Sequence, residues 1–277
     1  GLDNSQLTNA LGVAGTLSAG VREVFGTHGK PLHAGHAAEN GLRAAKWAQV
    51  GFTGGNDIIG GRRGFWAVAS RDGHSEEALV GDFGKRWELK MNGLKPFANG
   101  IVSHPIQQAV IELRNEFSLK AEQIDSIEAR VHPLVLELMN RANPQVGLEG
   151  KFSFQHCAAA ALIDGAGHDA QFSDEKVNDP TISMVRSKVS ATVDNTVAED
   201  EVYLSINLLD GRKLEKHIKH ATGSPTNPMT DEALNEKYHT LASEVLPQTQ
   251  VAELASAVWN LDNSSDISDI SRLMQRI

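Results

Sequence analysis

Residues 152–163, FSFQHCAAAALI, form the stretch that decides the fold of this chain. Their length and alanine-rich composition predict a helix, and no polar face runs along it. Both faces of such a helix must be buried, so we expect it at the centre of a core. Gln155 and His156 enter that core with polar groups, and these groups must find hydrogen-bond partners there.

The spacing of apolar residues changes along the rest of the chain from helical to mixed and back to helical. Apolar residues recur at helical spacing over residues 4–19, 36–50, 103–117 and 230–277. Alternation predicts strands over residues 87–91, 124–132, 190–193, 202–209 and 213–220, the last two joined by a hairpin turn at 210–212. We therefore expect an α+β multidomain protein. A mostly helical domain, residues 1–85, is interrupted by an α+β domain, residues 86–225, and residues 226–277 return to the helical domain.

Composition narrows the classes of partner. The 277 residues carry a net charge of -9, and an acidic chain is a poor ligand for nucleic acid, which needs a basic surface. A few lysines can still make a local positive pocket for a small anion. Cys157 is the single cysteine, so no intrachain disulfide can form, and no apolar run reaches membrane-spanning length. We expect an intracellular protein of the cytoplasm or of an organelle, mitochondria included, with no membrane partner.

The segment GTHGKPLHAGH, residues 26–36, gathers titratable groups next to a predicted helix. We expect it to be a loop in which Lys30, between a glycine and a proline, offers a cation to a substrate carboxylate. The alternative is a solvated surface lysine. His28, His33 and His36 lack the cysteine or carboxylate that would complete a recognisable metal-ligand spacing, so we predict no metal site.

Two further clusters contain candidate residues. Lys95 precedes a proline, as Lys30 does, which favours an extended backbone. His104 follows Ser103, the predicted N-cap of a helix, and that position disfavours the charged imidazolium and favours a bound anion. The alternative is that His104 only packs at the helix start. His156 either lines a polar pocket or is a satisfied core histidine, and Cys157 is expected to be a buried apolar group rather than a nucleophile.

Four segments together resemble the MmgE/PrpD family. They are GTHGKPLHAG at 26–35 with Asn40-Gly41, GFTG at 51–54 through GRRGF at 61–65, LKPF at 94–97 through His104-Pro105, and GKFS at 150–153 through Asp164-Gly165. The family includes 2-methylcitrate dehydratases, cis-aconitate decarboxylases and an iminodisuccinate epimerase. The resemblance implies a helical domain with an α+β lid domain. It also implies a cofactor-free site between them for small di- or tricarboxylates, usually in a homodimer.

The resemblance also assigns site residues. Lys30 and Lys95 match the family's active-site lysines, and His156 stands where many relatives carry a tyrosine. Gly100 stands where the decarboxylases carry a catalytic histidine, which disfavours that activity. We expect Lys30, Lys95 and His156 to take part in catalysis. The residues expected to contact the substrate are Thr27, His28, His33 and His104.

The predicted function is that of a hydro-lyase similar to 2-methylcitrate dehydratase. It would dehydrate, or hydrate, a small di- or tricarboxylic acid by removing a proton next to a carboxylate, and two lysines would stabilise the charge that develops. One alternative is an epimerase or decarboxylase on the same scaffold. Another is a truncated, non-catalytic subunit, because the family's helical domain normally begins upstream of Gly1, and we expect that N-terminal part to be lacking here.

Overall fold

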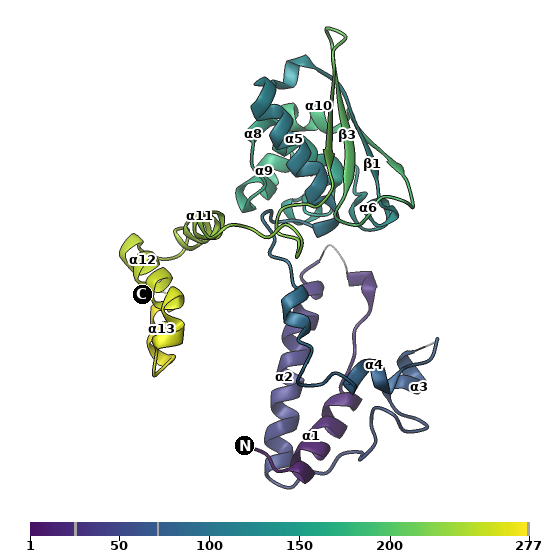
Figure 1. Ribbon diagram of the computed structural model, residues 1–277, viewed down its shortest axis with the longest axis vertical. Helices are drawn as coiled ribbons and strands as arrows, with labels where there is room; N and C mark the ends of the chain where they lie inside the picture. Colours follow the sequence, from purple (N-terminus) through teal and green to yellow (C-terminus); the bar gives the residue numbers. More distant parts are fainter. Residues whose placement is uncertain (25–26, 71, 276–277) are drawn as a thin grey trace. The chain divides into compact units, whose positions relative to one another are not determined.

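Two helices packed against each other, α1 (Asn4–Thr16) and α2 (Gly29–Gln49), carry the N-terminal part of the chain (Figure 1). We describe a computed structural model that covers residues 1–24, 27–70 and 72–275. Its contacts separate two compact units, Gly1–Leu89 and Lys90–Ile277. The first unit also holds the 3₁₀ turn η1 (Arg22–Val24) and the short helices α3 (Phe65–Ala69) and α4 (Glu76–Val80).

Local sequence explains how this first unit begins and packs. Asp3 caps α1 with a capping box, because its side chain accepts from the backbone N–H of Gln6 while the Gln6 side chain accepts from that of Asp3. Gly12 lets the 54–55 backbone approach closely, since a Cβ at Gly12 would stand 2.5 Å from the Gly55 nitrogen. Glycine is therefore required at this contact.

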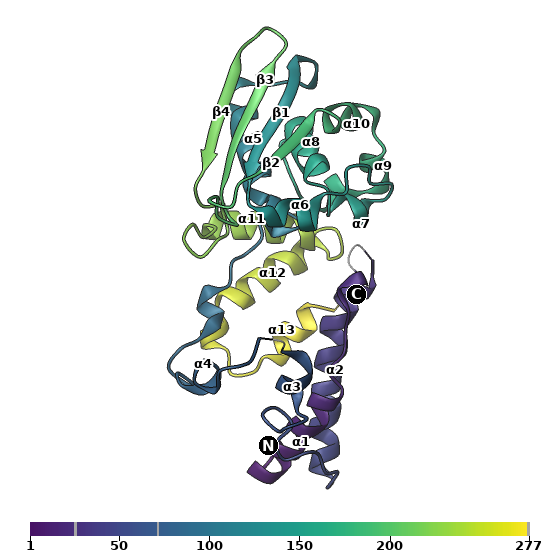
Figure 2. The ribbon, with the colours of Figure 1, turned by 90° about the vertical axis from the view of Figure 1, so that its right-hand side faces the viewer.

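The second unit is built around a mixed sheet, four-stranded among the described residues, in the order β2-β1-β3-β4 (Figure 2). Its strands are β1 (Ile124–Val131), β2 (Val189–Val193), β3 (Val202–Leu208) and β4 (Lys213–Ile218). β1 pairs parallel with β2 and antiparallel with β3, and β3 pairs antiparallel with β4. Alternate residues of β1 and β3 are buried, so one face of the sheet points into the core.

Helices α5 (His104–Phe117) and α8 (Phe154–Asp164) pack against each other and against strands of the sheet (Figure 1). The remaining helices of this region are α6 (Pro133–Met139), α7 (Gly147–Gly150), α9 (Asp174–Val177) and α10 (Pro180–Arg186), with 3₁₀ turns η2 (Glu88–Met91), η3 (Ile101–Ser103), η4 (Ala121–Gln123) and η5 (Asp169–Phe172). Residues 154–162 of α8 are all buried, which confirms the predicted central helix. Gly165, with φ of +69°, ends it.

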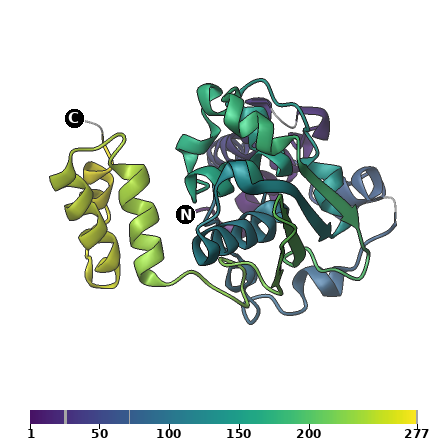
Figure 3. The same cartoon turned by 90° about the horizontal axis from the view of Figure 1, so that it is seen from above.

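The C-terminal part of the chain is helical, as predicted. It contains α11 (Asp231–Ala242), α12 (Gln248–Trp259), η6 (Leu261–Asn263) and α13 (Ser268–Leu273). Figure 3 shows α11, α12 and α13 as neighbours, in agreement with the contacts of α12 with the other two. Their return to the helical domain stays a prediction.

The chain is α+β and mostly helical, with a small mixed sheet. The strand predicted over residues 87–91 is wrong, because Glu88–Met91 forms a 3₁₀ turn. These residues are exposed, so their alternation does not reflect a buried face. Along the described ranges, no helix is both long and apolar enough to cross a membrane.

Candidate functional site

Lys30 lies on the first turn of α2, and its residue is exposed. The helix begins at Gly29, so the loop predicted up to His36 is wrong from Gly29 onward. Pro31 is compatible with this start, since the first amides of a helix have no partner inside it. Gly26, the first residue of the predicted loop, lies outside the described residues.

Thr27 shapes the turn ahead of this helix. Its hydroxyl oxygen accepts from the backbone N–H of Gly29 at 3.1 Å. His28 occupies the N-cap position and is exposed. His33, one helical turn beyond, is half-buried beside Gly20, where a Cβ would stand 3.2 Å from the His33 Nδ1. The structure thus gathers Thr27, His28 and Lys30 around the start of one helix.

His36 lies further along α2 and contacts other residues of the first unit. Its Nδ1 lies 3.7 Å from a carboxylate oxygen of Glu39, one turn along α2. It also lines a mostly apolar pocket of about 370 Å³. The other lining residues are Leu11, Ala14, Gly15, Leu17, Ser18, Ala19, Ala37, Asn40, Gly41, Ile58, Ile59 and Phe65. Within the described ranges, no group of three or more His, Cys, Asp or Glu residues is arranged to hold a metal ion.

In the second unit, Lys95 and His104 meet at the backbone of Asn99. The Lys95 ammonium donates to the Asn99 carbonyl at 3.0 Å, and the Lys95 carbonyl accepts from the Lys237 ammonium at 2.7 Å. His104 is 1% exposed. Burial, reinforced by the positive charge of Lys95, lowers the pKa of His104 to about 4. His104 is therefore an uncharged imidazole at neutral pH, and the causes are its burial and the nearby lysine charges rather than its predicted place at a helix start.

A buried polar cluster continues from Asn99. The Asn99 Nδ2 donates to the Gln107 Oε1 at 2.6 Å and contacts the Cys157 sulfur at 2.9 Å. Asn99 Oδ1, His104 Nε2 and Gln107 Nε2 are buried and have no hydrogen-bond partner among the described residues. Buried polar atoms normally have partners, so this cluster can accept and donate further bonds. Burial raises the pKa of Cys157 to about 12, so its thiol stays protonated at neutral pH.

His104 also lines a pocket of about 340 Å³. Apolar residues such as Leu94 and Ile101 form much of its wall, and Glu199 and Asp200 add carboxylates. Two carboxylates disfavour an anionic ligand at that wall.

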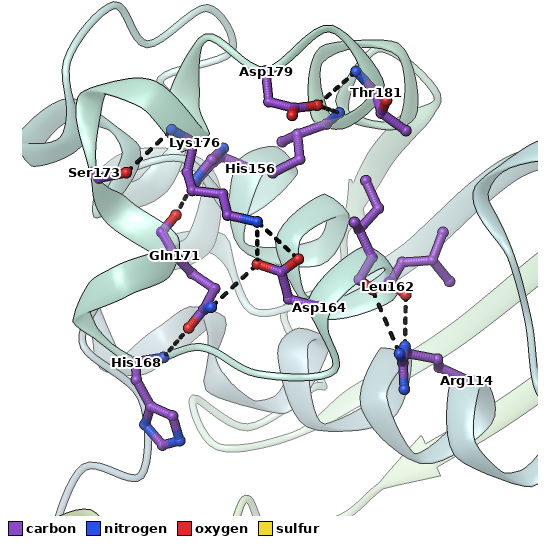
Figure 4. A network of polar contacts seen from close by, with 12 residues as sticks. Arg114, His156, Leu162, Asp164, His168, Gln171, Ser173, Lys176, Asp179 and Thr181 are labelled. Carbon is purple, nitrogen blue, oxygen red and sulfur yellow. Dashed lines mark hydrogen bonds and ion pairs between the residues drawn. The ribbon is translucent and has the colours of Figure 1, made fainter. Parts of the chain in front are cut away.

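His156 lies in the first turn of α8, next to Cys157 in the sequence, and is completely buried. Its Nε2 lies 2.9 Å from the Gln171 carbonyl (Figure 4). Its Nδ1 has no hydrogen-bond partner within the part of the chain that the structure describes. Phe172 packs on the ring with centroids 5.6 Å apart. Burial lowers the pKa of His156, and the hydrogen bond to Gln171 opposes that effect in part. His156 is thus a neutral histidine at pH 7, and its Nε2 is hydrogen-bonded.

Comparison with known proteins assigns this arrangement to a family. Residues 97–263 match the MmgE/PrpD C-terminal domain, and residues 1–78 match the MmgE/PrpD N-terminal domain. The chain belongs to the MmgE/PrpD family. The resemblance inferred from the four sequence segments is therefore confirmed.

The curated MmgE/PrpD relatives include cis-aconitate decarboxylases. The chain is 28% identical to that of Mus musculus over 287 residues and 28% identical to that of Homo sapiens over 286 residues. It is 25% identical to cis-aconitate decarboxylase of Aspergillus terreus over 301 residues. Each alignment covers 99% of this chain, but the chain spans only 58% to 60% of the length of these relatives.

The MmgE/PrpD site residues predicted from the sequence fall into three groups. Thr27, His28, His33 and Lys30 belong to the first unit, Lys95 and His104 share the Asn99 carbonyl in the second, and His156 occupies a separate environment at Gln171. Their catalytic and substrate-binding roles stay predictions. Sequence reasoning missed Asn99, Gln107, Asp164 and Gln171. The signal available for Gln107 was its place three residues after His104, which puts both side chains on one side of the predicted helix.

Proposed function

We propose that this MmgE/PrpD chain is a lyase that dehydrates, or hydrates, a small di- or tricarboxylic acid such as 2-methylcitrate. The reaction begins with removal of a proton next to a carboxylate. One observation carries the proposal: the Lys95 ammonium is held 3.0 Å from the Asn99 carbonyl, beside the buried, uncharged His104. A fixed cation beside a neutral imidazole suits the binding of a substrate carboxylate.

The lysines stabilise charge in this mechanism. When a proton leaves the carbon next to a carboxylate, negative charge spreads into that carboxylate. A preorganised ammonium lowers the energy of this state more than that of the ground state. The hydrogen bond from Lys95 to the Asn99 carbonyl supports this role, because it restrains the ammonium. Lys30, exposed at the start of α2, is the second proposed cation.

His156 is the proposed proton-transfer group. A carbonyl oxygen can only accept a hydrogen bond, so the Nε2 facing the Gln171 carbonyl carries the proton in the neutral ring. The Nδ1 then holds an unshared electron pair and has no partner within the described residues. An uncharged imidazole with a free lone pair is a competent general base.

A cis-aconitate decarboxylase activity is the second candidate, and the names of the relatives favour it. Gly100 weighs against it. The family resemblance places a decarboxylase's catalytic histidine at this position, whereas this chain has no side chain there. The Met139 sulfur fills the adjacent space. We therefore rank dehydration above decarboxylation, with epimerisation as a third outcome of the same proton abstraction.

A homodimer without a cofactor is part of the proposal and rests on the family resemblance. The first unit carries large apolar side chains that are strongly exposed, among them Val68, Phe83 and Trp87. Such a surface favours coverage by another protein surface. It equally favours the alternative of a non-catalytic subunit. Light scattering on the purified chain distinguishes a defined dimer from aggregation.

Product analysis tests the proposed reaction. The purified chain is incubated separately with 2-methylcitrate, citrate and cis-aconitate, and the products are identified by proton NMR and by carbon dioxide release. The proposal predicts loss or gain of water without carbon dioxide. Release of carbon dioxide from cis-aconitate favours the decarboxylase instead. A folded dimer that changes none of the three acids contradicts the proposed substrates.

A further inference from the structure

A network of hydrogen bonds and an ion pair connects the Asp164 carboxylate to His156 through Gln171 (Figure 4). Lys176 donates to both carboxylate oxygens of Asp164, at 3.0 and 2.8 Å. The Gln171 Nε2 donates to the same carboxylate at 3.1 Å. Asp164, at the C-terminus of α8, thus ties two later segments of the chain to the helix that carries His156.

Gln171 connects Asp164 to His156. Its side-chain oxygen accepts from the His168 backbone N–H at 3.0 Å, so both ends of the amide are held. The backbone carbonyl of the same residue receives the His156 Nε2–H at 2.9 Å. The two side-chain hydrogen bonds restrain the whole Gln171 residue. Its backbone carbonyl therefore has little freedom to rotate away from the imidazole.

We propose that Asp164 is a positioning residue for His156. By holding Gln171 and Lys176, it keeps the Gln171 carbonyl against the His156 Nε2 and so fixes the ring as the Nε2–H tautomer, with Nδ1 as the proton acceptor. The inference rests on the proposed catalytic role of His156 for its functional part. Its structural part, the choice of tautomer, does not depend on that role.

Two charged neighbours act on the pKa of His156 and not on its tautomer. Asp164 favours the protonated ring and Arg186 disfavours it, so the two charged neighbours act in opposite directions. Asp164 makes no direct contact with the ring in this network, because its carboxylate oxygens receive Lys176 and Gln171. Its effect on the tautomer is therefore indirect, through the position of the Gln171 carbonyl.

The test measures the tautomer directly. The full chain is labelled with ¹⁵N-histidine, and the cross-peaks of the ring nitrogens are recorded for wild type, Asp164→Asn and Asp164→Glu. The His156 signals are assigned by their loss in His156→Gln. We expect wild type to show an Nε2–H ring, Asp164→Asn to show a mixture of tautomers, and Asp164→Glu to recover part of the wild-type signal. An unchanged His156 spectrum in Asp164→Asn overturns the proposal.

The chain offers a closely matched control. Glu112 accepts from the Lys216 ammonium at 2.7 Å and from the Gln108 side-chain amide at 2.8 Å. Asp164 likewise accepts from one lysine and one glutamine side chain. Glu112→Gln should leave the His156 signals unchanged. If Asp164→Asn fails to fold, Gln171→Ala replaces it, because this variant removes the side-chain anchor and keeps the backbone carbonyl. Wild-type His156 signals in folded Gln171→Ala then overturn the proposal.

Kinetics separate positioning from simple structural support. With an active wild type, Asp164→Asn should lower kcat by roughly 10- to 100-fold with little change in KM, because the base is misplaced while the binding groups remain. An altered tautomer with unchanged kcat overturns the functional part. If His156→Gln keeps full turnover, the catalytic role of His156 fails, and the NMR comparison still decides whether Asp164 sets the tautomer.

Discussion

The sulfur of Met139 lies against the Cα of Gly100. A Cβ added at Gly100 would stand 2.1 Å from that sulfur, far inside a van der Waals contact. Gly100 itself has φ of -67°, a value open to any residue, so the space and not the backbone excludes a side chain here. Met139 therefore occupies the room that a histidine at position 100 would need.

The first prediction follows from this contact. Gly100→His alone should destabilise the fold by about 1 to 3 kcal/mol, because the new ring overlaps Met139. The cost of Gly100→His should be smaller in a Met139→Ala background than in wild type, and the double variant should gain carbon dioxide release from cis-aconitate. Urea unfolding and a carbon dioxide assay measure the two effects, with Met139→Ala alone as the control, because this buried residue contributes to stability itself. An equal cost of Gly100→His in both backgrounds contradicts the steric account.

A second prediction concerns Lys95. Lys95→Ala should reduce kcat/KM by about 100-fold or more, because a fixed charge next to the reacting carboxylate is lost. Its residue is exposed, so the free energy of unfolding should change by no more than about 1 kcal/mol. Lys90→Ala, an exposed lysine of the same unit, should retain turnover. Steady-state kinetics and thermal unfolding of both variants check this, and full activity in Lys95→Ala removes it from the site.

Much of the second unit could be predicted from the sequence. The helix at 103–117, the strand at 124–132 and the hairpin around Gly211 appear within one or two residues of the expected bounds, because burial imposes their periodicity. The exposed segments were less predictable. Residues 87–91 alternate, but Glu88–Met91 forms an exposed 3₁₀ turn. The first turn of α2 contains a glycine and a proline, which suggested a loop.

The sequence indicated which residues are candidates for the site, but not which groups surround and contact them. Lys95 and His104 are close together through Asn99, which no periodic pattern indicates, since the contact depends on the fold of the 94–104 segment. His156 proved to be both buried and hydrogen-bonded. Its partner is a backbone carbonyl at Gln171, and a carbonyl partner cannot be predicted from residue type.

A third prediction concerns pH. The pKa of His104 is about 4 in the folded chain against an ordinary 6.5, so between these values the unfolded state binds more protons. The free energy of unfolding should therefore fall as pH drops from about 6.5 toward 4, by about 3 kcal/mol from this residue. The lowered pKa of His156 acts in the same direction. Urea unfolding across this range should give a shallower dependence in His104→Gln, and an identical dependence contradicts the burial argument.

A fourth prediction uses Cys157, which is buried at the Asn99 cluster. Because burial raises the pKa of its thiol to about 12, iodoacetamide at mildly alkaline pH should leave it unmodified in the folded chain. Urea should expose it and allow rapid labelling. Mass spectrometry before and after unfolding measures both states. Rapid labelling of the native chain shows instead that the core around α8 opens readily.

The most direct test of the proposed lyase activity is ultraviolet absorbance with 2-methylcitrate, citrate and cis-aconitate, in which a conjugated double bond appears or vanishes. We expect a change with wild type that is lost in Lys30→Ala and retained in Lys46→Ala, an exposed lysine on the same helix α2. No absorbance change with any of the three acids, in a sample shown to be folded, contradicts the proposed function. A change that persists in Lys30→Ala contradicts the role of Lys30.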